Sequence, residues 1–197
     1  MPTSHRQAVR VALRGLMPEW RVQTVDHVSY LPGGYANDNY RFEYEGGAYA
    51  LRIARHPGAD RRAEALFLQL ASAPEVVAFD LPTGHLLTRW IDGALLADSP
   101  VPPETAAAYV QALHAEIPSG VRSYDPREAI HRDLAGAGKL ARNAVLALER
   151  LDWTPAGLGG CHNDLNPWNV LCTERGWRTL DWEFAGDNDP LFDVVCL

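Results

Sequence analysis

The stretch CHNDLNPWNV at residues 161–170 and the stretch LDWEFAG at residues 180–186 decide how this chain folds. Gly159-Gly160 predicts a break in regular secondary structure before the first stretch. That stretch begins as a loop, because it is rich in asparagine and contains a proline, and it runs into a short apolar strand. A turn at residues 174–176 then predicts a return strand over residues 177–180. Such a hairpin brings the two stretches together although they are separated along the chain.

Three polar residues stand in these stretches at a spacing that suits phosphoryl transfer. Asn169 follows Asp164 by five residues, and Asp181 follows twelve residues later. A carboxylate near an attacking hydroxyl can accept its proton, and amide and carboxylate oxygens can hold Mg²⁺ against the phosphates of ATP. The spacing therefore predicts Asp164 as the catalytic residue, Asn169 and Asp181 as Mg²⁺ ligands, and ATP as the phosphate donor.

Composition restricts the class of protein. The chain has 197 residues, of which 47% are hydrophobic, enough for one domain or two small lobes with a core. A net charge of −7 without any basic run argues against a nucleic-acid partner. No segment has the apolar length of a membrane span, and residues 1–21 contain arginines throughout, unlike a signal peptide. The three cysteines predict reduced thiols in a cytoplasmic protein.

The first half of the chain predicts a strand-rich lobe with few helices. Its apolar residues alternate along short runs, as in strands, or repeat at helical spacing. The expected elements are a helix at residues 5–17, a strand at 22–31, a hairpin within 38–54, a helix at 60–72, and strands at 75–79 and 85–90.

The second half predicts a helical lobe that carries the hairpin. A proline-rich connection at residues 98–103 marks the boundary, which gives a nucleotide-binding lobe at 1–97 and a catalytic lobe at 98–197. One helix is expected at 104–117, and one long or two short helices at 126–151, with a break at the glycines 136 and 138. The predicted fold class is α+β, with the two-lobe order of a protein-kinase-like fold.

A glycine-containing loop and the strand after it predict a nucleotide site. Gly33 and Gly34 allow the backbone to approach phosphates closely, although a plain hairpin loop has the same composition. The loop is neither a Walker motif nor a dinucleotide fingerprint. Arg52 stands where a kinase has its phosphate-pairing lysine, and Glu64 where it has the partner carboxylate. The alternative is a surface arginine and a solvated glutamate; the downstream stretches favour the functional pair.

A second segment, HRDL at residues 131–134, spells the protein-kinase catalytic signature. The asparagine required five residues after its aspartate is missing, because position 138 is glycine. The apolar residues around the segment repeat at helical spacing between Pro126 and Gly136. We therefore interpret HRDL as part of a helix and not as a catalytic loop.

These residues resemble those of a known family. HNDL together with Asn169 resembles the catalytic loop of the aminoglycoside phosphotransferase and choline kinase group, which are kinase-like small-molecule phosphotransferases. LDWEFAG followed by DPLFD at residues 189–193 resembles the metal-binding segment of that group, and Leu113-His114 resembles the end of its preceding helix. Arg52 in place of a lysine is more similar to the choline, ethanolamine and thiamine kinase branch than to the antibiotic-resistance branch.

The resemblance implies a role for each matched residue. Asp164 is implied as the base or hydroxyl-orienting residue, and Asn169 and Asp181 as the Mg²⁺ ligands. His162 and Asp193 are implied to brace the loop. The nucleotide site is implied to consist of Gly33 and Gly34, which cover the phosphates, Arg52, which contacts them, and Glu64, which orients Arg52. Arg89 and Trp90 are implied to belong to a hinge at residues 88–91 that touches adenine through backbone groups.

The function that these residues imply is an ATP- and Mg²⁺-dependent kinase for the hydroxyl of a small metabolite such as choline, ethanolamine or thiamine. An acidic chain with six tryptophans suits a cationic acceptor. Trp168, Trp182 and Glu183 are candidates for contacting it, and ordinary core packing is the alternative for the tryptophans. Two other interpretations remain open: an aminoglycoside O-phosphotransferase, and a non-catalytic nucleotide-binding pseudokinase or truncated fragment.

The chain departs from the family pattern at its end. Members of the family continue for several helices beyond the DPLFD segment, whereas this sequence ends at Leu197. We therefore expect an incomplete C-lobe, belonging to a fragment, to a trimmed natural form, or to a protein completed by a partner. The sequence does not distinguish these, and it leaves open the acceptor, the oligomeric state and the choice between ATP and GTP.

Overall fold

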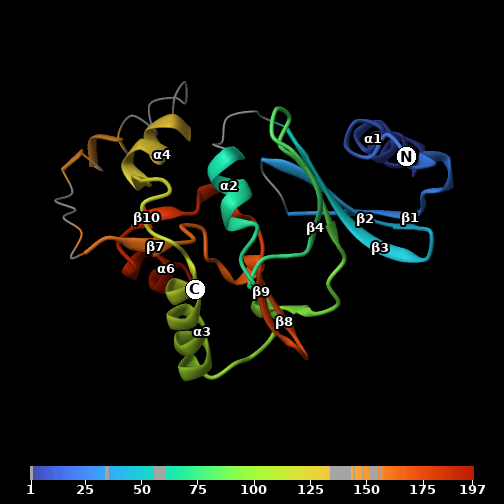
Figure 1. Ribbon diagram of the computed structural model, residues 1–197. Coiled ribbons are helices and arrows are strands. Elements are labelled where there is room, and N and C mark those ends of the chain that lie inside the picture. The colour runs from blue at the N-terminus through green and yellow to red at the C-terminus, as the bar shows by residue number, and fades with distance from the viewer. Residues whose placement is uncertain are drawn as a thin grey trace.

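The computed structural model describes residues 2–33, 36–55, 61–133, 143, 145–147, 149–150, 155 and 157–197. Gly34, predicted to cover phosphates, and the predicted helix break at Gly136 and Gly138 lie outside these residues. Figure 1 shows a strand-rich N-terminal lobe beside a second lobe that carries most of the helices. None of the helices in the described part is long and apolar enough to cross a membrane.

The N-terminal lobe is an antiparallel sheet covered on one face by a helix. The strands lie in the order β1-β2-β3-β5-β4. Their bounds are β1 Asp26–Leu31, β2 Asn37–Tyr44, β3 Gly47–Ala54, β4 Val76–Asp80 and β5 His85–Arg89, and the covering helix is α1, Pro2–Leu16 (Figure 1). Glu45 and Gly46 join β2 to β3 with φ angles of 48° and 79°. Two positive φ angles suit a tight hairpin turn, and the predicted hairpin is confirmed.

Alternation of apolar residues along the strands builds the core of this lobe. Phe42, Leu51 and Leu87 come from three neighbouring strands and are at most 1% exposed. Val9 and Leu13, which are one helical turn apart on α1, are fully buried in the same cluster. The opposite face of the sheet is thereby left to face the second lobe.

Two sequence predictions for this lobe were wrong in detail. Residues Val22–Thr24 form a short 3-10 helix, η1, where a strand was predicted, because the Thr24 hydroxyl donates to the Arg21 carbonyl at 2.9 Å and stabilises a tight turn. The helix predicted at 60–72 is shorter: α2 spans Arg61–Phe67. The chain then tightens into a turn, in which the Leu70 amide donates to the Phe67 carbonyl at 3.1 Å.

The second lobe combines three described helices with short strands. The helices are α3 (Pro103–Glu116), α4 (Pro126–Asp133) and α6 (Leu191–Cys196). The strands are β6 (Ala94–Leu95), β7 (Gly159–Cys161), β8 (Val170–Thr173), β9 (Gly176–Thr179) and β10 (Gly186–Asn188), and single 3-10 turns occur at η2 (Leu96–Asp98), η3 (Pro167–Asn169) and η4 (Trp182–Phe184). The β8–β9 hairpin confirms the pairing predicted from the sequence.

Two further expectations concern this lobe. The first three residues of the HRDL segment, from His131 to Asp133, lie in α4, as predicted. The division of the chain at residues 97 and 98 remains a prediction. Strand β6, which precedes that division, pairs with β8 of the second lobe.

Gly159 and Gly160 form a strand, so the predicted break at this point was wrong. They belong to β7, in which Gly160 pairs with Asp187 of β10. A Cβ atom on Gly160 would lie 2.4 Å from the carbonyl oxygen of Ile117, at the end of α3. Glycine is needed here because the helix end approaches the strand too closely for any side chain.

We predict that Gly160→Ala destabilises the protein by about 1–3 kcal/mol, because the new methyl group forces the backbone of β7 away from Ile117. The free energy of unfolding, measured by urea denaturation, tests this. Gly15→Ala is the matched control, because a Cβ there meets nothing within 4 Å and the residue lies in a helix. That variant should be unchanged or slightly more stable. Equal stabilities for the two variants would contradict the prediction.

Candidate active site

Asp164 and Asn169 are in direct contact within one loop. The Asn169 amide nitrogen Nδ2 donates to Asp164 Oδ2 at 2.8 Å and to the Asp164 carbonyl at 2.9 Å. Asn166 Nδ2 donates to the other carboxylate oxygen, Oδ1, at 3.0 Å. Burial raises the pKa of the Asp164 carboxyl, whereas the hydrogen bonds from the two asparagines act in the opposite direction. The carboxylate is therefore held in one orientation.

The hairpin places Asn169 beside the residue that precedes Asp181. The Leu180 amide donates to the Asn169 carbonyl at 2.7 Å, which extends the β8–β9 ladder by one step. Asp181 follows with φ 60° and ψ 65°, a left-handed conformation that aspartate tolerates better than most residues. Because Asn169 Nδ2 is engaged with Asp164, its amide oxygen is the atom left for a cation. The oxygens of Asn169 and Asp181 form a donor set that fits Mg²⁺.

His162 connects the loop to this hairpin. It is fully buried, and its Nδ1 accepts a hydrogen bond from the Asp164 amide at 3.3 Å. Its Nε2 lies 2.9 Å from the Leu180 carbonyl oxygen, which can only accept. The ring is therefore the neutral tautomer with its proton on Nε2. Burial lowers the pKa of the imidazole and favours this neutral form.

Asp193 of α6 holds the start of the loop that contains Asp164 through backbone amides. Its Oδ2 accepts from the His162 amide at 2.7 Å, and its Oδ1 accepts from the Asn163 amide at 2.8 Å. His114, at the end of α3, contributes a third contact, with its Nε2 at 2.9 Å from Oδ2. Asp193 is completely buried. One carboxylate therefore binds α3, α6 and the catalytic loop together.

Asn163 is a further residue that holds the loop, and the sequence reasoning missed its role. It adopts a left-handed conformation with φ 66°. Its Nδ2 donates to the carbonyls of Phe184 and Gly186 at 3.0 and 3.1 Å, and its Oδ1 accepts from Asn188 at 2.8 Å. The tolerance of asparagine for positive φ was the one signal that could have identified it.

Arg52 and Glu64 form a buried ion pair, so the alternative of a surface arginine and a solvated glutamate is wrong. The side chains are 8% and 0% exposed, with Arg52 Nη1 at 2.6 Å from Glu64 Oε1. The same nitrogen lies 3.4 Å from Asp181 Oδ1. Burial alone would lower the pKa of the Arg52 guanidinium, but Glu64, Asp181 and Glu183 more than offset it and leave the pKa raised. Arg52 therefore stays charged between the two lobes.

Arg61 and Glu183 enlarge this charged cluster. Arg61 Nη1 donates to Glu64 Oε2 at 2.7 Å and to Glu183 Oε2 at 3.0 Å. Asn37, at the start of β2, lies 3.4 Å from the other oxygen of Glu183. Glu183 is 5% exposed, so the prediction that it contacts the acceptor was wrong. Arg61 lies three residues before Glu64 on α2, a helical spacing at which opposite charges pair.

The two tryptophans proposed for the acceptor differ in position. Trp182 is fully buried, its ring stacks on Phe67 with centroids 6.4 Å apart, and its indole nitrogen donates to the Thr179 carbonyl at 2.9 Å. It is a core residue and cannot contact the acceptor. Trp168 is 66% exposed and directly precedes Asn169. It remains the candidate for an acceptor contact.

The predicted hinge residues lie at the end of β5. The Arg89 amide donates to the Glu75 carbonyl at 2.9 Å, and the Trp90 amide donates to the Ala48 carbonyl at 3.0 Å. Because both protons are engaged within the lobe, a backbone contact with adenine would have to use carbonyl oxygens or the amide of Ile91. Gly33, which follows β1 and was predicted to cover the phosphates, is exposed and has φ 118°. A Cβ there would meet nothing within 4 Å.

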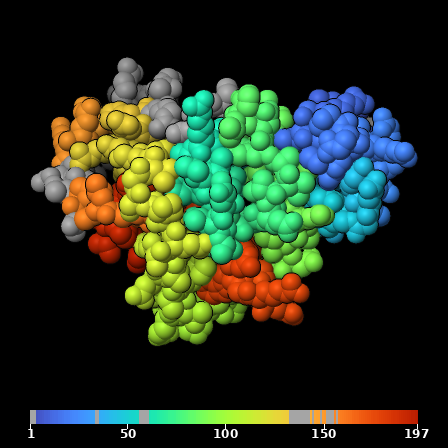
Figure 2. Space-filling model, in the orientation of Figure 1, coloured from blue at the N-terminus to red at the C-terminus, as the bar shows by residue number. Residues whose placement is uncertain are grey.

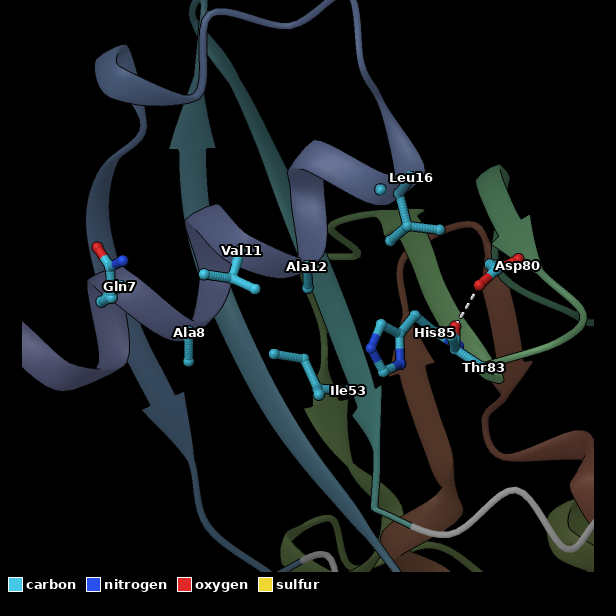
Figure 3. Close-up of a pocket in the computed structure, with 10 residues that line it drawn as sticks. Gln7, Ala8, Val11, Ala12, Leu16, Ile53, Asp80, Thr83 and His85 are labelled. Atoms are coloured by element: carbon cyan, nitrogen blue, oxygen red, sulfur yellow. Dashed lines mark hydrogen bonds between the residues drawn. The ribbon is translucent and has the colours of Figure 1, made fainter.

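Two other features do not form part of this site. A cavity of about 460 Å³ lies between α1 and the sheet, lined among others by Val11, Ile53 and His85, and contains none of the predicted site residues (Figure 3). His114, Cys161 and Asp193 place ligand atoms within 4.8 Å of one another. Burial raises the pKa of the Cys161 thiol to about 12, and both Asp193 oxygens accept backbone hydrogen bonds, so this group does not suit a metal.

A two-lobe fold with these polar residues at its centre is that of a protein-kinase-like phosphotransferase. Residues 27–197 match the model of the phosphotransferase enzyme family (APH), and the chain belongs to this family. The family suggested by the sequence is thereby confirmed.

Solved structures that resemble this chain include a choline/ethanolamine kinase family protein and an aminoglycoside phosphotransferase. The chain is 26% identical to a choline/ethanolamine kinase family protein from Mesorhizobium loti, with a TM-score of 0.67 over 97% of this chain and 69% of that one. It shares its fold with a thermostable mutant of aminoglycoside phosphotransferase APH(4)-Ia, solved as a ternary complex with AMP-PNP and hygromycin B. That likeness has 20% identity and a TM-score of 0.61 over 95% of this chain and 74% of that one.

Among curated proteins, the chain matches Protein LicA of Haemophilus influenzae over a short segment. The two are 49% identical over 37 residues, which is 19% of this chain and 14% of LicA. The match therefore spans only a small part of the length of that relative.

We predict that Asp193→Asn loosens the catalytic loop and lowers the free energy of unfolding by about 2–3 kcal/mol. The substitution replaces one charged acceptor by an NH₂ group that faces a backbone N–H. Urea denaturation measures the loss. Asp98→Asn is the control, because Asp98 is exposed and its substitution should change stability little. Similar stabilities for both variants would show that the Asp193 contacts do not hold the loop.

We predict a pH dependence that originates at Asp181. Burial, and then the charge of Glu183, raise the pKa of this carboxyl from 3.8 to about 7. Between these pH values the folded, metal-free protein keeps a proton that the unfolded chain releases. The contribution of Asp181 to stability therefore falls as pH rises from 3.8 to about 7. Urea denaturation in EDTA should show the stability of the wild type falling relative to Asp181→Asn across this range; a constant or growing difference would contradict it.

Proposed function

We propose that the protein is an ATP- and Mg²⁺-dependent phosphotransferase that phosphorylates the hydroxyl of a small metabolite, with choline, ethanolamine or thiamine as the leading acceptors. One observation carries the proposal: Asp164, Asn169 and Asp181 converge through hydrogen bonds of the loop and the hairpin, and the buried Arg52–Glu64 pair meets Asp181 at 3.4 Å. Membership of a phosphotransferase family agrees with this arrangement.

Asp164 is proposed as the proton acceptor. As the acceptor oxygen attacks the γ-phosphorus, the bond from that phosphorus to the ADP oxygen breaks, and the hydroxyl proton passes to the Asp164 carboxylate. A pKa raised by burial improves a carboxylate as a base, and the hydrogen bonds from Asn166 and Asn169 fix its direction. The protein contributes positioning and charge, and no covalent intermediate is needed.

Asn169 and Asp181 are proposed to hold Mg²⁺ through their oxygens, which are the ligands that this hard cation prefers. Bound there, the ion would neutralise charge on the phosphates of ATP. Arg52 is proposed to contact the phosphates, oriented by Glu64. Its guanidinium already lies next to Asp181, so the phosphate and metal positions adjoin.

The remaining nucleotide contacts are proposed from the loop and the hinge. Gly33 and Gly34 would cover the phosphates with backbone groups. The segment around Arg89 and Trp90 would meet adenine through carbonyl oxygens or the Ile91 amide, because the amides of Arg89 and Trp90 are already bonded.

A cationic acceptor is supported by two features. The chain carries a net charge of −7, and the exposed indole of Trp168 directly precedes the proposed Mg²⁺ ligand Asn169. An aromatic face attracts quaternary ammonium groups through cation–π contacts. Choline fits this chemistry best among the acceptors considered. Aminoglycosides are also cationic, so they are the second candidate acceptors.

We predict that the purified chain consumes ATP with Mg²⁺ in the presence of one acceptor from a panel of choline, ethanolamine, thiamine and an aminoglycoside. Asp164→Asn should lower the turnover roughly 10²–10⁴-fold, because it removes the proton acceptor but keeps the shape of the side chain. Asp98→Asn, an exposed substitution, should retain turnover. ADP release by a coupled assay and mass spectrometry of the phosphorylated product measure both.

The outcomes separate the alternatives. Turnover by Asp164→Asn at the wild-type rate would sink the assignment of the base. Nucleotide binding without transfer to any acceptor of the panel would favour a pseudokinase. Absence of both binding and transfer in a cooperatively folded chain would overturn the phosphotransferase proposal for this chain.

A further inference from the structure

Arg61 lies at the centre of a buried cluster of charges that spans the two lobes. It is the first residue of α2 and only 6% exposed, whereas its neighbour Arg62 is exposed. One nitrogen, Nη1, contacts two carboxylates: Glu64 at 2.7 Å and Glu183 at 3.0 Å. The side chains of these two glutamates are 0% and 6% exposed, so the negative charge of both depends on the cation for compensation.

Both partners of Arg61 are connected to groups proposed for the chemistry. Glu64 pairs with Arg52, the proposed phosphate contact. Glu183 stands two residues after Asp181, a proposed Mg²⁺ ligand, and is 122 residues from Arg61 along the chain. A single guanidinium therefore joins the helix that orients the phosphate contact to the segment that carries the metal ligand.

The surroundings keep Arg61 in this position. A Cβ on Gly84, in the turn between β4 and β5, would lie 2.5 Å from Arg61 Nε, so the turn backbone packs directly on the guanidinium. The Gly84 carbonyl also accepts a hydrogen bond from Arg52 Nη2 at 3.3 Å. On the other side, α2 packs against η4, and Figure 2 shows α2 in teal between the strands of the first lobe and the helices of the second.

Glu183 receives a further contact from the nucleotide-binding lobe. Asn37 Nδ2 lies 3.4 Å from its Oε1, at the point where the glycine-containing loop enters β2. The Arg122 guanidinium donates to the Glu183 carbonyl at 2.9 Å from within the second lobe. The segment that follows Asp181 is thus bonded from both lobes, and Arg61 makes the shorter of the two contacts from the first lobe to the Glu183 side chain.

We propose that Arg61 is a positioning residue: an interlobe latch that holds Arg52 and Asp181 in register for the nucleotide by bridging Glu64 and Glu183. The proposal rests on the proposed function of this site. It predicts a specific energetic coupling between positions 61 and 183 that is expressed in nucleotide affinity and turnover, and not only in stability.

The test compares Arg61→Gln, Arg61→Lys, Glu183→Gln, the double variant Arg61→Gln/Glu183→Gln, and Arg62→Gln as the matched exposed control. Affinity for Mg²⁺–ATP is measured by calorimetry, and kcat and KM are measured separately for ATP and for the acceptor. All values are referred to the folded fraction, determined from a thermal melt.

Arg61→Gln should weaken Mg²⁺–ATP binding roughly tenfold or more and lower kcat, with little change in the KM for the acceptor. Arg61→Lys should restore part of the loss, because an ammonium keeps the charge but reaches the two carboxylates less well. The double variant should bind Mg²⁺–ATP no more weakly than Arg61→Gln alone, because it also removes the Glu183 carboxylate that loses its cation in the single variant. Arg62→Gln should match the wild type.

Two results would overturn the latch. One is a lower melting temperature of Arg61→Gln with unchanged nucleotide affinity and turnover per folded molecule, which indicates a structural role alone. The other is strict additivity of the two single variants. Failure of the latch can be distinguished from failure of the proposed function. If the wild type binds Mg²⁺–ATP but shows no turnover, the coupling between positions 61 and 183 can still be measured through nucleotide affinity. A wild type that neither binds nor transfers removes both proposals.

Discussion

The carboxylate of Asp193 is the constraint on which the rest of the site depends. Its two oxygens accept the amides of His162 and Asn163, and His114 contacts one of them from α3. A buried carboxylate that is fully hydrogen-bonded in this way has a fixed position, because any movement leaves charged oxygen unsatisfied. The loop that starts at these amides therefore enters with a defined direction, and Asp164 is placed by its first residues.

Polar contacts, each with one geometry, connect this loop to the segment that contains Asp181. The neutral imidazole of His162 accepts from the Asp164 amide and donates to the Leu180 carbonyl, so it fixes the distance between the loop and the hairpin. Asn163 does the same on the other side by donating to the Phe184 and Gly186 carbonyls. Charge then links the lobes, since Arg52 lies between Glu64 and Asp181. The position of Asp181 therefore depends on backbone hydrogen bonds, on neutral side chains and on ion pairs together.

Much of this architecture could be predicted because it follows from local patterns. The β8–β9 hairpin was readable from a turn sequence between two apolar runs, and its register brings Asn169 opposite Leu180. The short β7 and β10 strands were not readable. They contain glycines that are required by the close approach of Ile117 and Arg122, and a close approach between distant segments leaves no periodic pattern. The role of Asn163 was missed for the same reason, because its partners Phe184, Gly186 and Asn188 are distant in the sequence.

The sequence by itself determined the residue types and spacing of the polar site, the family, and the longer strands and helices, because turn chemistry and apolar periodicity act over a few residues. Only the tertiary structure decided which charges are buried and with whom they pair. Trp182 lies in the core, where it stacks on Phe67, and Glu183 pairs with Arg61 and is not available to an acceptor. Burial and long-range ion pairing depend on how two lobes pack, and packing joins residues more than a hundred positions apart.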